Sequence, residues 1–167
     1  MIAETQITRW QAASIRTVDI EERLARTLQP ETLAHVHRVA HLARALAERH
    51  GVDPDRVELA ALLHEVAAPY TERELLRLAE YFELRLDMTE VRVPELLHGK
   101  IGAEILRQEW GITDHELLAA VRNHVAGADH MGVVEKIIFL SDKLEPDRDK
   151  FYHDLDPVRI LALEDCA

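Results

Sequence analysis

Hydrophobic residues recur every three to four positions in almost every segment of the chain, which is the period of an amphipathic α-helix. The pattern is weak at the start, becomes clear in the short segment 19–28, and stops near Pro30. Residues 133–144 carry a β-branched run and form the only segment that would also suit a strand. The pattern therefore predicts an all-α protein without internal repeats, low-complexity tracts or linkers.

Local start and stop signals set the expected bounds of the longer helices. Pro30 suits the first turn of a helix that Gly51 would close. Asp53 and Pro54 open the next helix, which we expect to run to about Ala68. Two capping-box patterns, Thr71 with Glu74 and Thr113 with Glu116, predict two further helix starts, and Pro94 predicts another. Residues 85–93 are expected to form a loop.

The chain has 167 residues and an apolar fraction of 47%. This length suits one well-buried domain and is short for two, and the composition is that of a globular protein. We therefore expect a single-domain helical bundle over residues 30–150. A helical extension over residues 1–29 precedes it, and a tail of mixed character over residues 151–167 follows it.

Charge and cysteine content exclude several classes of protein. A formal net charge of −11 is unsuited to nucleic acid, whose binding needs clustered Lys and Arg, and to anionic membranes. Cys166 is the only cysteine, so no internal disulfide can form, and this fits a reducing cytosol. There is no signal-peptide pattern and no apolar run of about 18 residues. We expect a cytoplasmic protein with no nucleic-acid or membrane partner.

Ten histidines are the unusual feature of the composition, and their helical positions differ. His35 lies on the same predicted helix face as Val39 and Leu42, which is the apolar face. His37 and His41 lie on the opposite face. This pair has the spacing of metal ligands, but a solvated face is the simpler interpretation. A lone histidine on an apolar face is most often a satisfied core residue, and that interpretation stays open for His35.

Three more histidines and one aspartate also fall on apolar helix faces. Each alone favours a core residue, but together they favour a shared metal centre, because convergence satisfies buried polar groups. Nitrogen and oxygen ligands without thiolate suit iron, manganese, cobalt or zinc. The inward set is His35, His64, His98, His124 and Asp142, whereas His50, His115, His130 and His153 fall at helix ends or in loops and are expected at the surface.

Glu65 follows His64 in an otherwise almost wholly apolar run, "ELAALLHEVAAPYT". An unpaired buried charge is costly, so this glutamate needs a partner, a metal or access to solvent. It lies about 100° around a helix from His64 and nearly in line with Glu58. A narrow solvent-facing stripe is therefore one interpretation, and a metal ligand is the other.

The order of these residues and the sequence around them resemble a known family. The order of these residues along the chain resembles that of the HD-domain metal-dependent phosphohydrolases. The sequence segments around them are most similar to the YqeK-type symmetrical diadenosine tetraphosphate hydrolases. The resemblance covers about residues 31–150. It rests on the segments "RVAHLARALAERHGVD", "ELAALLHEVA", "LLHGKIGAEIL" and "AVRNHVAGADHMGVVEKIIFLSDKLEPDRD".

The resemblance implies an all-helical domain of the HD type that holds two metal ions, often iron, with manganese or cobalt as alternatives. It also implies cleavage of the tetraphosphate bridge into two molecules of ADP, with water polarised between two cations attacking a phosphorus. By matching position, His35, His64, His98, His124 and Asp142 would be ligands. Glu65 would stand where the family has an aspartate that bridges both ions. Candidates for catalytic roles are Glu65, His98 and Lys100.

Two positions depart from the family pattern. Glu65 replaces the usual aspartate, which keeps the charge but moves the carboxylate by about 1.5 Å, one carbon–carbon bond. A flexible carboxylate can still bridge ions in a helical bundle, yet a displacement of about 1 Å can cost about a hundredfold in rate. Ala68 stands where the family commonly has a phosphate-neutralising lysine. Candidates to replace it and to bind substrate, each also an ordinary surface charge, are Lys100, Arg122, Lys143 and Arg148.

The first hypothesis is a metal-dependent phosphohydrolase that cleaves diadenosine tetraphosphate symmetrically. The second keeps the site but takes another nucleotide or phosphoester. The third is a metal-binding or nucleotide-binding module with weakened or lost catalysis, for which Glu65 and Ala68 would be the reason. A plain helical interaction domain would leave the inward histidines unexplained. The expected partner is a small nucleotide, and a homodimer is compatible with the sequence.

Overall fold

The computed structural model describes residues 17–150 and 154–164, and the secondary structure of these residues is helical, without a strand. This confirms the all-α prediction, and the β-branched segment 133–144 is a helix. The elements are α1 (Thr17–Thr27), α2 (Pro30–Arg49), α3 (Pro54–Leu63), α4 (Glu72–Tyr81), α5 (Met88–Arg92), the 3-10 helix η2 (Pro94–Leu97), α6 (His98–Gln108), α7 (His115–Asn123), α8 (Val133–Leu144), the 3-10 helix η3 (Pro146–Lys150) and α9 (Asp156–Glu164).

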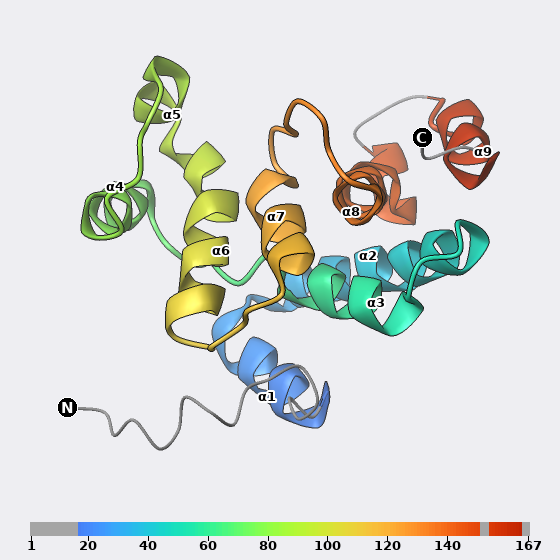
Figure 1. The fold of residues 1–167 in the computed structure, drawn as a ribbon, viewed down its shortest axis with the longest axis horizontal. Coiled ribbons are helices and arrows are strands. Elements are labelled where there is room, and N and C mark those ends of the chain that lie inside the picture. The colour runs from blue at the N-terminus through green and yellow to red at the C-terminus, as the bar shows by residue number, and fades with distance from the viewer. Residues whose placement is uncertain (1–16, 151–153, 165–167) are drawn as a thin grey trace.

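The core lies where α2, α3, α7 and α8 pack against one another. Val39, Leu63, Val121 and Ile138, one from each of these helices, are fully buried there. Figure 1 shows α4 and α5 at one end beside α6, and α8 and α9 at the opposite end, with α7 between them. The candidate site lies where α2, the carboxyl-terminal ends of α3 and α7, the start of α6 and the last turn of α8 converge.

The helix expected to run to about Ala68 ends at Leu63, so that prediction was wrong. Residues 64–69 form consecutive turns, with hydrogen bonds from Val66 N to Leu63 O and from Ala68 N to Glu65 O. Pro69, which has no N–H to donate, prevents a helix beyond Ala68, and the turns before it use hydrogen bonds to the residue three positions earlier in place of the helical bonds to the residue four positions earlier.

Local capping explains the other differences in helix bounds. The box at Thr71 and Glu74 is confirmed, whereas the cap expected at Thr113 is wrong by one residue, because Asp114 accepts from the backbone of α7. Residues 85–93, expected as a loop, contain α5, which starts with a second capping box and is too short to show a period. Pro94 opens η2, and α6 begins only at His98. Part of the mixed tail forms α9.

Some sequence predictions fall outside the described residues. These are the interpretations placed on residues 1–16, His153 and Cys166. Among the described helices, none combines the length and apolar character that crossing a membrane requires.

Candidate metal centre

The structure brings together all six residues that the sequence proposed as metal ligands. Their ligand atoms fall into two groups, each within 4.8 Å, and Glu65 belongs to both. One group could hold one ion and the second group another, with the glutamate between them. The first group is His35, His64, Glu65 and Asp142, and the second is Glu65, His98 and His124.

Three of the four histidines are held in the same way by the backbone. His64 and His124 directly follow α3 and α7, and His98 is the first residue of α6. Each ring directs Nδ1 to the carbonyl oxygen three residues earlier, at 2.6 Å for His64, 2.8 Å for His124 and 2.6 Å for His98. Because a carbonyl can only accept, each Nδ1 carries the hydrogen, and each Nε2 presents a free lone pair to the site.

A glycine allows two of these rings to meet. A Cβ atom on Gly99 would lie 2.8 Å from Arg122 O, so a side chain there would push α6 away from the end of α7. The close approach leaves 3.0 Å between Nε2 of His98 and Nε2 of His124. Two lone pairs at that distance repel each other unless a proton on one ring or a metal ion lies between them. Two ligand nitrogens about 2.1 Å from one ion, at a right angle, are about 3.0 Å apart.

Glu65 points into this cluster and not toward solvent. Its carboxylate oxygens lie 3.9 Å from His35 Nε2, 3.7 Å from His64 Nε2 and 3.5 Å from His98 Nε2, and its side chain is 14% exposed. Glu58 instead pairs with Arg44 at 2.6 Å. The solvent-stripe interpretation assumed one continuous helix, and it fails because the chain turns after Leu63.

Asp142 is held as an anion by its neighbours. Its Oδ1 lies 3.1 Å from His35 Nε2 and 2.7 Å from Arg148 Nη2, and its Oδ2 lies 2.6 Å from Lys143 Nζ. Burial alone would raise the pKa of this carboxyl, but the hydrogen bond to His35 and the charge and hydrogen bond of Lys143 hold the pKa well below its usual range. An ionised carboxylate is the form that binds a metal.

Both ring nitrogens of His35 face carboxylates. Nδ1 lies 3.2 Å from Glu145 Oε1, and Nε2 faces Asp142. Burial lowers the pKa of His35, but the hydrogen bonds to these two carboxylates outweigh it and raise the pKa overall. The raised pKa means that this site favours a positive charge at Nε2, which faces Asp142. A metal ion between His35 and Asp142 would supply that charge in place of the proton.

The two most buried rings fit a metal for a different reason. Burial lowers the pKa of His64, and burial together with His64 and His98 lowers the pKa of His124 well below its usual range. Both rings are therefore neutral, which is the form that ligates metals. Among the described residues, Nε2 of His64 has no hydrogen-bond partner although it is buried. A buried acceptor without a partner is costly, and a metal ion would satisfy it.

A pocket of about 700 Å³ opens beside the first group of ligands. His35 and Glu65 form part of its lining, and Arg38, Arg148 and Lys150 supply positive charge to it. Cationic side chains next to a metal site suit a phosphate-bearing ligand. The lining also includes Ala68 and the acidic residues Glu31, Glu145 and Asp147.

The four proposed substrate-binding cations are not placed together. Lys100 pairs with Glu90, and Arg122 pairs with Glu104 at 2.7 Å; neither lines this pocket. Lys143 and Arg148 contact Asp142, and Arg148 also lines the pocket.

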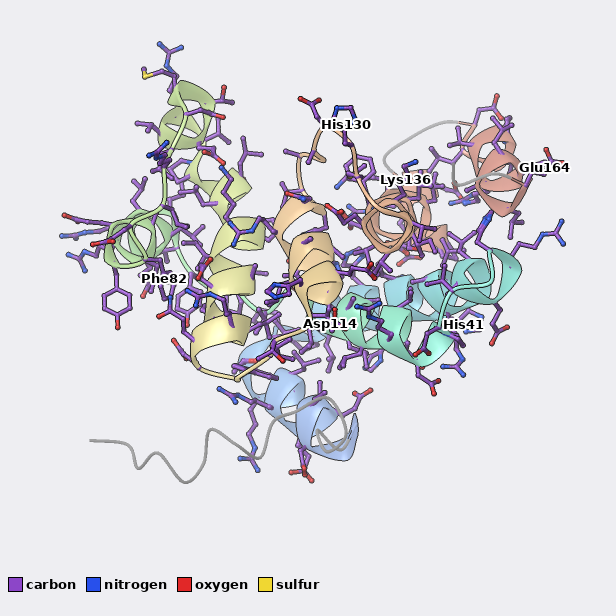
Figure 2. All side chains as sticks on the ribbon, viewed as in Figure 1. His41, Phe82, Asp114, His130, Lys136 and Glu164 are labelled. Atoms are coloured by element: carbon purple, nitrogen blue, oxygen red, sulfur yellow. The ribbon has the colours of Figure 1, made fainter. Side chains whose placement is uncertain are left out.

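The histidines expected at the surface lie away from the cluster. His37 and His41 are exposed, with His37 Nε2 3.4 Å from Glu21. His115 is also exposed, and His130 lies at the tip of the loop between α7 and α8 and points outward (Figure 2). His50 is only partly exposed, because Nε2 lies 2.8 Å from Ala162 O on α9.

Sequence reasoning missed three residues of the site, one of which is Lys150 in the pocket lining. Glu145 contacts His35, and Arg38 lines the pocket while its Nε donates to Glu145 Oε2 at 2.7 Å. Arg38 lies one helical turn after His35, and this spacing indicates that the two side chains are neighbours on one helix face. The signal for Glu145 was an acidic residue three positions after Asp142, just before the proline that ends the helix.

Comparisons with known proteins agree with this arrangement. The HD domain family model matches residues 32–147. A symmetrical bis(5'-nucleosyl)-tetraphosphatase of Staphylococcus aureus is 36% identical over 78% of this chain and 68% of its own. The enzyme of that name from Bacillus subtilis is 33% identical over 87% of this chain and 78% of its own. A predicted HD superfamily hydrolase involved in NAD metabolism, from Clostridium acetobutylicum, has a crystal structure that aligns with a TM-score of 0.85 at 27% identity, covering 90% and 79% of the two chains.

Proposed function

Because the chain belongs to the HD-domain family and is a metal-dependent phosphohydrolase of that family, we propose that it hydrolyses diadenosine tetraphosphate symmetrically. The observation that carries the proposal is Glu65, shared by two groups of ligand atoms at the edge of a pocket whose wall includes two arginines and a lysine. The activity for which the relatives in Staphylococcus aureus and Bacillus subtilis are named supports the choice of substrate.

The metal content belongs to the same proposal. We infer two ions, with iron first and manganese or cobalt as alternatives, held by the two groups that share Glu65. When bound, such ions polarise water and neutralise charge on phosphoryl oxygens. His98, which is closest to Glu65 among the histidines, belongs with it to the face that would meet the water.

The reaction divides the substrate at its centre. Water adds its oxygen to one of the two middle phosphorus atoms, the bridging P–O bond breaks, and the second ADP leaves with the bridging oxygen. Arg38, Arg148 and Lys150 would hold the phosphate chain at the pocket wall, because guanidinium groups bind phosphate oxygens in pairs and the lysine ammonium adds a positive point charge. Lys100 and Arg122, which pair with Glu90 and Glu104, do not line this pocket.

The product pattern tests the proposal directly. We expect metal-loaded protein to convert diadenosine tetraphosphate into ADP alone, and a chelator to abolish turnover, because the ions supply the nucleophile. Chromatography of the products with a metal add-back series measures both. ATP and AMP as products would contradict symmetric cleavage, and turnover of other phosphoesters alone would favour the hypothesis of another substrate.

Ala68 provides a test of the alternative in which catalysis is weakened. Ala68 is exposed on the pocket wall, where a lysine would add positive charge near the phosphates. We expect Ala68→Lys to lower KM or raise kcat for diadenosine tetraphosphate by about threefold to tenfold, the effect of one additional charged contact of about 1 kcal/mol. Steady-state kinetics at fixed metal concentration measure this, with Ala68→Gln as the uncharged control of similar reach. Equal kinetics for the two variants would mean that no phosphate passes this position.

Three further features remain part of this proposal. We infer a domain boundary near residues 30 and 150, supported by the family match to residues 32–147. We also propose a cytoplasmic location and a homodimer. Exposed apolar side chains on α9, among them Ile160 and Leu161, would suit contact with a second copy.

A further inference from the structure

A single buried carboxylate connects the candidate metal centre to the pocket beside it. Glu145 has a side chain that is 3% exposed, and its two oxygens face different partners. We propose that Glu145 is a positioning residue, which sets the ring of His35 toward the metals and the guanidinium of Arg38 toward the phosphate chain. The inference rests on the proposed function for its second half, since the phosphate chain belongs to the proposed substrate.

The first half concerns the way in which His35 is held. The rings of His64, His98 and His124 are fixed by backbone carbonyls, which no substitution removes. The Nδ1 atom of His35 instead faces Glu145 Oε1 at 3.2 Å. His35 is therefore the one histidine of the four whose orientation depends on another side chain. A carboxylate in this position also makes the ring a stronger ligand through Nε2.

The second half concerns Arg38. Its Nε donates to Glu145 Oε2 at 2.7 Å, and its Nη2 lies 3.3 Å from Asp147 Oδ2. The backbone N–H of Asp147 also donates to Glu145 Oε2, at 2.9 Å. These contacts fix a side chain that is 32% exposed and lines the pocket. A guanidinium fixed before substrate arrives loses less conformational freedom when phosphate binds.

The backbone makes one carboxylate sufficient for both tasks. His35 and Arg38 are three residues apart on α2, so their side chains lie on the same face, one turn apart. Glu145 follows the last residue of α8, and Pro146 turns the chain into η3. The end of α8 therefore places one carboxylate between two side chains that are 110 and 107 residues away in sequence.

Glu145→Gln tests the proposal because it keeps the size of the side chain and only one acceptor oxygen. The new amide NH2 would face a donor, so the side chain cannot accept from both His35 Nδ1–H and Arg38 Nε–H. We expect metal affinity to fall by about tenfold to a hundredfold, the range for loss of a group that orients a ligand. At saturating metal, we expect KM for diadenosine tetraphosphate to rise by about tenfold while kcat changes less.

Nuclear magnetic resonance of the histidine rings separates positioning from general damage. In metal-free protein, we expect Glu145→Gln to change the ring nitrogen signals of His35 and to leave those of His64, His98 and His124 in place. In the background of Arg38→Ala, the effect of Glu145→Gln on KM should shrink, because both changes remove the same contact.

Glu104→Gln is the matched control. Glu104 is also a buried glutamate that accepts from two arginines, Arg107 and Arg122, but it contacts none of the six candidate ligands. We expect it to lower stability without changing metal affinity, KM or the His35 signals. If Glu145→Gln changes these three quantities no more than Glu104→Gln does, the positioning role is wrong. If wild-type protein binds metal but does not cleave the dinucleotide, the proposed function fails, and metal affinity with the ring signals still decides the role of Glu145 toward His35.

Discussion

Replacing His124 by alanine is expected to reduce bound metal to less than about a tenth of the wild-type content and hydrolysis of diadenosine tetraphosphate by at least about a hundredfold. Even groups that only orient a ligand change affinity or activity by about tenfold to a hundredfold, so loss of a ligand atom has a larger effect. His124 is 1% exposed and its Nε2 faces that of His98, so no water-exposed alternative ligand replaces it. Elemental analysis and product chromatography measure the two quantities.

Stability gives a second measurement on the same variant. Metal that binds only the folded state stabilises it, so added metal should raise the midpoint of thermal unfolding in wild type and fail to do so in His124→Ala. His115→Ala is the matched control, because His115 is an exposed residue at the other end of the same helix. If His124→Ala binds as much metal as wild type, His124 is not a metal ligand.

Replacing Glu65 by glutamine is expected to have the second large effect. The change keeps the shape of the side chain but removes the negative charge that would lie between two cations. Its amide N–H groups would also donate to the lone pairs of the histidine rings and compete with the ions. We expect metal affinity to fall by at least about tenfold and turnover by at least about a hundredfold. Metal titration and steady-state kinetics on the purified variant give both values.

Two further variants make the result specific to this carboxylate. Glu65→Asp, which draws the carboxylate back by one carbon–carbon bond, should raise metal occupancy or turnover if the longer arm holds one ion more firmly than the other. Glu58→Gln is the control, because Glu58 belongs to the preceding helix and pairs with Arg44. Metal binding and kinetics of Glu65→Gln equal to those of wild type would show that Glu65 is not a ligand.

The parts of the fold that depend on local pattern were predictable from the sequence. The helical period of the hydrophobic positions, the prolines and the capping residues predicted the all-α class. They also predicted the start of α4 at the capping box of Thr71. The directions of His35 and Asp142 followed from helical phase, since both lie inside regular helices. The direction of Glu65 did not, because it follows the end of α3 in a series of turns, where helical phase has no meaning.

The parts of the site that the sequence did not predict depend on contacts between distant parts of the chain. The pairing of Lys100 with Glu90 is one of them, because Glu90 lies in a segment without a visible period. Arg38 and Glu145 were missed for a similar reason, because their hydrogen bond joins residues that are 107 positions apart in sequence. A sequence pattern reports which face of a helix is apolar, but it does not report which charge on another helix lies opposite.

The ends of α3 and α7 at the candidate site have an electrostatic consequence for the order of binding. A helix carries partial negative charge at its carboxyl end, and here two such ends, followed by His64 and His124, approach a cluster that already contains Glu65, Asp142 and Glu145. The metal-free site therefore attracts cations and repels a polyphosphate, in spite of the arginines at the pocket wall. Bound cations would reverse the local potential. We therefore expect sequential assembly, with metal entering first and the nucleotide binding only to the loaded protein.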